Sequence, residues 1–141
     1  MKKHKFRTEP LTTASMPSGV VHLVVNEGAE RFSYYGMRSI LVVFMTGMLL
    51  NAQGSLDPMG EAEAKSYFHL FASAVYFFPF LGAILADAFL GKYKTIILLS
   101  LVYCGGHVVL AFDHTRFGLL LGLTLIAIGS GGIKPCVSAN L

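Results

Sequence analysis

Apolar residues in this chain gather in long runs that short polar segments separate. The first segment, at about 19–50, is apolar mainly in its second half, and three further runs follow at about 65–90, 95–112 and 117–141. A helix needs about 20 apolar residues to cross the hydrocarbon core of a bilayer. The pattern therefore predicts an all-α membrane protein with four transmembrane helices.

Turn-forming and capping residues mark where these helices begin and end. Residues 51–60 are dense in Asn, Gly, Asp and Pro, which predicts a loop. Glu61 and Glu63 follow where a helix N-terminus favours negative charge, and Thr115 is a suitable N-cap for the last helix. Pro79 lies inside the second run and predicts a kink that neighbouring helices support.

The composition agrees with a membrane protein and argues against other classes. Hydrophobic residues make up 54% of the 141 residues and charged residues 13%, whereas soluble domains carry about 25% charged residues. The sequence has no nucleophile elbow, phosphate-binding loop or metal-ligand spacing, so we expect neither an enzyme nor a bound metal or cofactor. Cys104 and Cys136 lie inside apolar runs, where we expect them to be packing residues.

The basic residues that give the chain its net charge of +3 lie next to the apolar runs. A basic arm occupies residues 1–17, and Lys92 and Lys94 lie in a short connection at 91–94. Under the positive-inside rule these segments are cytoplasmic, which predicts a multi-pass protein of the plasma (inner) membrane with a cytoplasmic N-terminus. The basic residues are not interleaved with base-stacking aromatics, so we expect a lipid bilayer, and no nucleic acid, as partner.

The charged residues of the first helix lie on one stripe. At about 100° per residue, an arc of about 100° contains Glu27, Glu30, Arg31, Tyr34 and Arg38. A charge at the centre of a lipid-facing helix costs roughly 2.5–3.5 kcal/mol, so we expect the stripe to face a wet or protein-lined interior. Glutamate and arginine one and four residues apart can neutralise each other locally. A purely structural ion-pair seam between helices is the alternative.

This segment resembles the E-x-x-E-R-F-x-Y-Y-G signature of the proton-dependent oligopeptide transporter (POT/PTR) family, within the major facilitator superfamily. The matching residues are Glu27, Glu30, Arg31, Phe32, Tyr34, Tyr35 and Gly36. Residues 82–94 are similar to the superfamily's loop between its second and third spans, although three residues separate Asp87 from Gly91 and Ala88 replaces the usual base. Residues 129–140 resemble the family's fourth span, which carries a lysine.

The resemblance implies proton-coupled symport of di- and tripeptides by alternating access, with protons as the coupling ion and no cofactor. A carboxylate can couple proton movement to peptide movement, because burial favours its protonated form whereas a neighbouring cation favours its ionised form. The residues implied in proton coupling are Glu27, Glu30, Arg31, Lys134 and His69. Those implied in peptide binding are Arg31, Tyr34, Tyr35, Arg38, Tyr76 and Lys134. Those implied in gating at the cytoplasmic face are Asp87, Gly91, Lys92 and Lys94.

Several of these residues also have a purely structural interpretation. Lys134 is the only charged residue of the fourth run, so it needs an acidic partner if it is buried, but it could also extend to the cytoplasmic surface. His69 titrates near neutrality, as a proton relay requires, yet a lone membrane histidine can also be a helix contact. For Tyr34, Tyr35 and Tyr76 the alternative is aromatic packing.

The end of the sequence indicates a longer protein. The fourth run continues to Leu141 without a polar tail, and the Gly-Ser-Gly-Gly stretch at 129–132 resembles the middle of a longer helix. After the cytoplasmic arm at 1–17, we therefore expect residues 18–141 to be the first four transmembrane helices of a truncated transporter whose C-terminal half is missing. Two alternatives stay open: the same fold carrying nitrate or another small anion, and a membrane fragment that does not transport.

Overall fold

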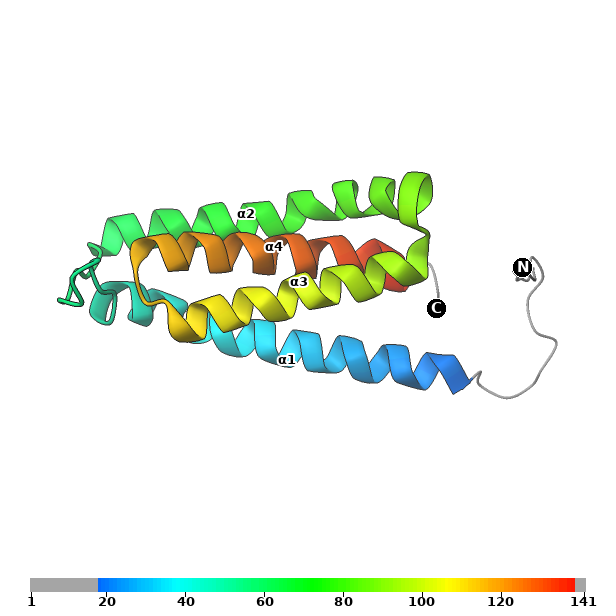
Figure 1. Cartoon of the computed structure of the whole chain (residues 1–141), viewed down its shortest axis with the longest axis horizontal. Helices are drawn as coiled ribbons and strands as arrows, with labels where there is room; N and C mark the ends of the chain where they lie inside the picture. Colours follow the sequence, from blue (N-terminus) through cyan, green and yellow to red (C-terminus); the bar gives the residue numbers. More distant parts are fainter. Residues whose placement is uncertain (1–17, 139–141) are drawn as a thin grey trace.

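The computed structural model describes residues 18–138, which fold into four long helices (Figure 1). They are α1 (Ser18–Gly47), α2 (Glu61–Leu85), α3 (Lys92–Phe112) and α4 (Arg116–Ser138), and a π-helical turn, η1 (Ala86–Leu90), extends α2. Successive helices run in opposite directions. The start of α1, Gly91 and the end of α4 therefore lie at one end of the bundle, called here the Gly91 end (Figure 1). The segments between α1 and α2 and between α3 and α4 lie at the other end, called the loop end.

The predicted order of helices is confirmed, with small differences at their ends. α1 ends at Gly47 instead of near residue 50, and the loop predicted at 51–60 is present. Glu61 and Glu63 lie in the first turn of α2, as the charge preference of a helix N-terminus predicts. The predicted arm at 1–17 and the last three residues of the fourth run lie outside the described residues.

The connection between the second and third runs is shorter than the sequence predicts. Gly91 alone separates η1 from α3, and Lys92 and Lys94 belong to the first turn of α3. Gly91 has a φ of 77°, which glycine adopts without the clash that a Cβ atom would bring. Its N–H bonds the carbonyl of Ala86 at 2.9 Å, and Thr95 donates in turn to the Gly91 carbonyl at 3.1 Å. One glycine is therefore enough to reverse the chain.

Three of the four helices are long and apolar enough to cross a membrane. Among the described residues these are Glu61–Leu90, Lys92–Phe112 and Arg116–Ser138. α1 has 30 residues, but the charged stripe interrupts its apolar surface. Large hydrophobic side chains also lie open on the surface, such as Phe32 at 84% and Phe112 at 85% exposed. Exposed apolar surface on this scale fits contact with lipid, so the chain is a multi-pass membrane protein.

α4 is the most buried helix, and four successive residues bring it close to the other three. A Cβ atom on Gly129 would collide with α3, and one on Gly131 would collide with α2. Ser130, between them, faces α1 and is 1% exposed. Gly132 packs backbone against backbone on Gly82 of α2. The stretch without large side chains therefore acts as the close contact point of the bundle.

The proline of α2 lies at this contact point. Proline has no N–H, so the carbonyl of Val75, four residues before Pro79, lacks its usual helical donor. A Cβ atom on Gly131 would lie 2.9 Å from that carbonyl oxygen and 3.3 Å from Cδ of Pro79. Because Gly131 has no side chain, α4 packs directly on α2 here, and a neighbouring helix supports the proline. The π-helical turn after α2 is an irregularity that the sequence does not predict.

The turn before α4 is fixed by its own side chains. Thr115 accepts a hydrogen bond at Oγ1 from the N–H of Gly118 at 3.2 Å, so the predicted N-cap is confirmed. Asp113 accepts one at Oδ1 from the N–H of Thr115 at 3.0 Å. The side chain of Thr115 and then its backbone N–H, both hydrogen-bonded to the Asp113 carboxylate, lower the pKa of Asp113 because they stabilise its ionised form.

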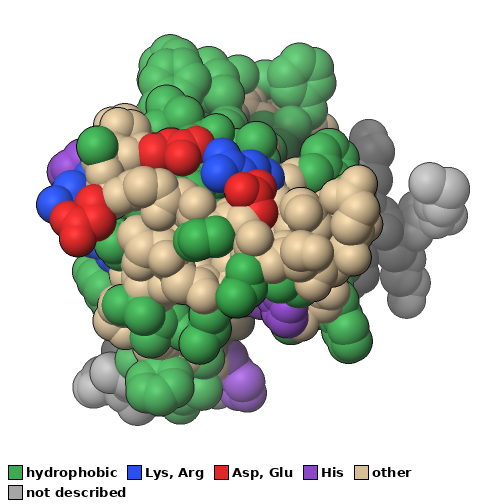
Figure 2. Space-filling view, turned by 90° about the vertical axis from the view of Figure 1, so that its left-hand side faces the viewer, with side chains coloured by type: hydrophobic (Ala, Val, Ile, Leu, Met, Phe, Trp, Pro, Cys, Tyr) green, Lys and Arg blue, Asp and Glu red, His purple; other side chains and the backbone are tan. Residues whose placement is uncertain are grey.

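An ion-pair network at the loop end holds the two connections together. Arg116, the first residue of α4, donates from Nε to Asp57 at 2.8 Å and from Nη1 to Glu63 of α2 at 2.7 Å. The N–H of Leu50 bonds the carbonyl of His114 at 3.0 Å in the same region. Figure 2 shows acidic and basic side chains gathered at this end, between hydrophobic surfaces. The network ties the loop and two helix ends into one unit.

Loss of this network lowers stability only moderately. Replacing Arg116 with glutamine removes both ion pairs and leaves two carboxylates close together, but each partner is about two-fifths exposed to solvent. We therefore expect a small but measurable loss of stability, as for ion pairs at a protein surface. Thermal unfolding of the purified full-length protein in detergent measures it. Lys65→Gln, which removes a well-exposed pair with Glu61, is the control and leaves the melting temperature unchanged. An equal effect of both variants contradicts this role of Arg116.

Candidate proton-coupling site

The charged stripe of α1 is paired within the helix at its first arginine. Arg31 donates from Nε and Nη2 to Oε1 of Glu27, at 3.0 and 2.5 Å. This is the four-residue spacing at which opposite charges meet on a helix. The pair is partly open, because 53% of the Arg31 side chain and 31% of the Glu27 side chain are exposed. Glu30 has different partners.

Glu30 is held by both α3 and α4. Ser130 of α4 donates a hydrogen bond from Oγ to Oε1 of Glu30. The backbone carbonyl of Glu30 accepts from Oγ of Ser33 at 3.0 Å and from the hydroxyl of Tyr103 of α3 at 3.1 Å. The two hydroxyls are themselves 2.6 Å apart. The carboxylate and the backbone of one residue are thus fixed by two different helices.

One small cavity joins four of the five residues that the sequence assigns to proton coupling. Its lining comes from α1 and α4: Asn26, Glu27, Glu30, Arg31, Ser130, Ile133, Lys134 and Val137. Its volume of about 20 Å³ is close to what one water molecule needs. Two acids and two bases therefore line one space between α1 and α4.

Lys134 lies among aromatic rings of α1 and α2. Its Nζ atom is 5.9 Å from the ring centroid of Tyr34 and 5.9 Å from that of Tyr76, both within the range of a cation–π contact. Tyr34 is buried and meets Tyr35 edge to face at 5.5 Å. Tyr76 is 80% exposed and Tyr35 is 56% exposed. The lysine and the predicted peptide-binding tyrosines therefore form one cluster beside the cavity.

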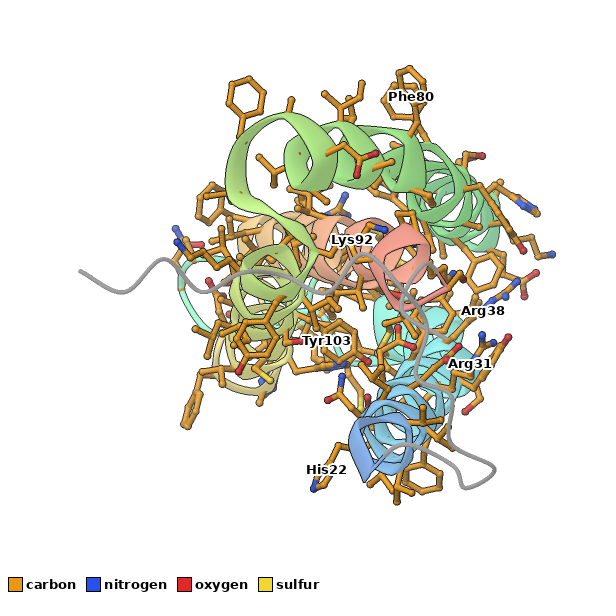
Figure 3. The ribbon with its side chains drawn as sticks, turned by 90° about the vertical axis from the view of Figure 1, so that its right-hand side faces the viewer. His22, Arg31, Arg38, Phe80, Lys92 and Tyr103 are labelled. Atoms are coloured by element: carbon orange, nitrogen blue, oxygen red, sulfur yellow. The ribbon has the colours of Figure 1, made fainter. Side chains whose placement is uncertain are left out.

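Arg38 extends the same side of α1 toward the loop end. Its Cζ atom lies 5.0 Å from the ring centroid of Phe68 of α2. In Figure 3, which looks from the Gly91 end, Arg31 and Arg38 project from the same side of α1, whereas Tyr103 lies on the other side. The two guanidinium groups thus face the side of the bundle that carries the cluster.

His69 and the predicted gating residues lie apart from the cavity. His69 is exposed on α2 and contacts the ring of Phe68, with centroids 5.8 Å apart. At the Gly91 end, Asp87 and Lys92 line a second cavity of about 120 Å³ together with Ala83, Ala86, Pro135 and Cys136. Lys94 is exposed on the first turn of α3. The structure therefore separates the cavity between α1 and α4 from a charged group at the Gly91 end of the bundle.

The two cysteines have different surroundings, and neither forms a disulfide within residues 18–138. Cys136 is buried at 2% exposure, as a packing residue is expected to be. Cys104 is exposed instead and lines an apolar groove of about 850 Å³ between α1 and α3. The prediction of a packing role was therefore wrong for Cys104, because its face of α3 is not covered by another helix in the described part of the chain.

Sequence reasoning missed the partners that hold Glu30. Ser130, Ser33 and Tyr103 are common residue types in membrane helices, and none belongs to a charged pattern. The one available signal was the stretch around Ser130, where a polar residue stands among three glycines at 129–132. Small residues mark close helix contacts in membranes, and a hydroxyl among them can bond across the contact.

Several known proteins are similar to this chain. Residues 93–141 match the family model PTR2, described as the POT family. The chain is 48% identical to peptide transporter family 1 of Drosophila melanogaster, over 87% of this chain and 16% of that protein. It is 44% identical to human solute carrier family 15 member 2, over 89% of this chain and 17% of that protein. A crystal structure of an auto-inhibited POT family peptide transporter superposes with a TM-score of 0.77 at 49% identity, covering 87% of this chain and 24% of that one.

The helices and these matches define a multi-pass membrane protein of the transporter class, not an enzyme. Within that class, the chain belongs to the POT family of peptide transporters. The chain spans about a sixth of the length of the curated relatives it matches.

Proposed function

We propose that this chain contributes to the proton-coupled symport of di- and tripeptides across a membrane by alternating access. The observation that carries the proposal is the cavity between α1 and α4, where two glutamates meet an arginine and a lysine. Such a cluster can exchange partners when one carboxylate gains a proton, which a structural ion-pair seam has no need to do. The names of the relatives, which are peptide transporters, support peptides as the cargo.

The four helices then correspond to the first four transmembrane helices of a major facilitator bundle, and α1 spans the membrane with the others. The Gly91 end, with Lys92 and Lys94 in the first turn of α3, lies in the cytoplasm under the positive-inside rule. The N-terminus then lies on the same, cytoplasmic side, and the membrane that the protein spans is the plasma membrane. A second, C-terminal bundle completes the transport path, because alternating access needs two halves that move around one site.

Proton and peptide are coupled at Glu30. In the ionised state its carboxylate shares the cavity with Arg31 and Lys134. Protonation removes one negative charge from a group with two cations, so that a cation becomes available for the terminal carboxylate of a peptide. Binding of one ligand therefore favours binding of the other, and by linkage the effect is mutual. Glu27 keeps Arg31 in place through the ion pair at 2.5 Å.

The aromatic cluster beside the cavity suits a ligand with varied side chains. Tyr34, Tyr35 and Tyr76 offer hydroxyls for a peptide backbone and ring faces for its side chains. Arg38 is a second candidate for the terminal carboxylate, because a guanidinium can bind a carboxylate through two parallel hydrogen bonds. His69, exposed on α2, is a secondary proton site in this proposal.

The charged group at the Gly91 end has a different role. Asp87 and Lys92 line one cavity next to the end of α4, and Gly91 permits the reversal between η1 and α3. We assign this group, with Lys94, to gating on the cytoplasmic side, without contact to the peptide.

Uptake by the full-length protein in proteoliposomes tests the proposed function. An inward proton gradient should drive accumulation of a labelled dipeptide, and excess unlabelled di- or tripeptide should compete, whereas nitrate should not. Nitrate uptake that dipeptides do not inhibit supports the anion-carrying alternative. Absence of both activities in protein that is folded and inserted supports a role other than transport.

A further inference from the structure

The carboxylate of Glu30 accepts a hydrogen bond from another helix. Within residues 18–138, the side chain that bonds it is Ser130 of α4, whose Oγ contacts Oε1. Ser130 is 1% exposed, although a serine hydroxyl is polar, so its burial requires a partner. The other serine hydroxyl of α4, on Ser138 at its end, bonds the carbonyl of Lys134 in its own helix instead. The contact of Ser130 is therefore a specific link between α1 and α4.

The position of Ser130 is set by its neighbours in the chain. Gly129 fits against α3 and Gly131 against α2, and a Cβ atom at either position would collide with the facing helix. Gly132 meets the backbone of Gly82 of α2, where a Cβ atom on Gly82 would overlap Gly132. Because successive residues of a helix point about 100° apart, the contacts with α3 and α2 leave Ser130 directed at α1. The hydroxyl thus cannot move far without separation of the helices.

The backbone of Glu30 is fixed independently of its carboxylate. Tyr103 of α3 and Ser33 hold its carbonyl at 3.1 and 3.0 Å. What remains free to turn is the side chain, and the Ser130 bond selects the direction in which it points. Without that bond the carboxylate could turn toward Arg31, one residue away on the same helix.

The Ser130 hydroxyl also distinguishes the two states of the carboxyl group. A hydrogen bond from a hydroxyl to an ionised carboxylate is roughly twice as strong as one between neutral groups. A serine hydroxyl can also accept a bond from a protonated carboxyl, so the contact survives protonation in a weaker form. The titratable groups around Glu30 come from three helices: Glu27, Arg31 and Tyr34 of α1, Tyr103 and His107 of α3, and Lys134 of α4.

We propose that Ser130 is a positioning residue for proton coupling: it directs the Glu30 carboxylate into the cavity shared with Lys134 and favours its ionised form. This proposal rests on the proposed function above. Ser130 does not exchange the proton itself, and it acts through Glu30. Its loss should change the pH at which coupling occurs rather than remove transport at every pH.

The pH dependence of dipeptide uptake by the full-length protein tests this role. Ser130→Ala removes the hydroxyl donor that favours the ionised carboxylate of Glu30. We expect the midpoint of proton-driven uptake to move upward by about one pH unit, the shift expected for one hydrogen bond to a charged group. Ser130→Thr keeps a hydroxyl, so a threonine variant that folds like the wild type should have the wild-type midpoint. The midpoint of the alanine variant decides the proposal whether or not the threonine variant folds.

A matched control and a second readout separate positioning from simple structural support. Ser66→Ala removes a serine hydroxyl that bonds only its own helix, at the carbonyl of Ala62, and should leave the midpoint unchanged. Uptake by Ser130→Ala that falls equally at every pH, with the midpoint of the wild type, overturns the proposal. Wild-type protein without proton-driven uptake overturns the proposed function first, so the two failures are distinguishable.

Discussion

Replacing Glu30 with glutamine lowers proton-driven dipeptide uptake on the order of 100-fold, the size of effect expected when a proton-transferring side chain is lost. Glutamine has nearly the same shape and can still accept the hydrogen bond from Ser130. What it cannot do is exchange a proton within the cavity that Arg31 and Lys134 line. We expect exchange of labelled for unlabelled dipeptide, without a proton gradient, to fall much less. Both rates are measured with the full-length protein in proteoliposomes.

The same substitution at a distant position provides the control for this experiment. Glu61→Gln changes a glutamate at the loop end whose side chain is 84% exposed, and it should leave both rates at their wild-type values. Proton-driven uptake by Glu30→Gln equal to that of the wild type refutes the coupling role of Glu30. In that event the charged stripe of α1 is the ion-pair seam that the sequence also permits.

The second large effect concerns the contact between α2 and α4. A Cβ atom on Gly82 would overlap the backbone of Gly132, where no flexible side chain can move aside. Gly82→Ala therefore forces the two helices apart, and we expect a loss of roughly 2–3 kcal/mol in stability, the upper range for overpacking. Thermal unfolding of the full-length protein in detergent measures it.

A glycine of a neighbouring helix offers a matched control, at which alanine is expected to keep or raise stability instead of lowering it. At Gly105 of α3, a Cβ atom would meet no other atom of the described residues within 4 Å, so alanine fits there. Alanine is favoured over glycine inside a helix by about 1 kcal/mol. Gly105→Ala should therefore keep or raise the melting temperature. If Gly82→Ala is as stable as Gly105→Ala, the close approach at Gly82 is not a feature of the folded protein.

The helices and the charged stripe could be predicted from the sequence because both depend on local periodicity. Apolar runs gave the number of helices, and 100° steps placed Glu27 and Arg31 on one face, where they form an ion pair. Lys134 was found by its resemblance to a family motif and by its isolation in an apolar run. The cavity then joins it to the glutamates of α1.

The partners across helices could not be predicted, because they depend on which faces meet. The sequence separates Ser130 from Glu30 by 100 residues and Tyr103 from Glu30 by 73. Their meeting depends on the close approaches that glycines permit, and spacing along one helix contains no information on these. The same holds for Arg116, which pairs with Asp57 and Glu63 at the loop end. A base at a helix N-terminus is unfavourable beside the helix dipole, and this was the one sign that it needs acidic partners.

Proton-coupled transport requires that protons enter together with the peptide, and the proposed role of Glu30 requires that this entry depends on Glu30. A pH-sensitive dye inside proteoliposomes reports the internal pH after dipeptide is added outside, with no proton gradient imposed. We expect acidification of the lumen with wild-type protein and none with Glu30→Gln, although labelled dipeptide still exchanges in that variant. Equal acidification with both proteins would contradict the proposed role of Glu30.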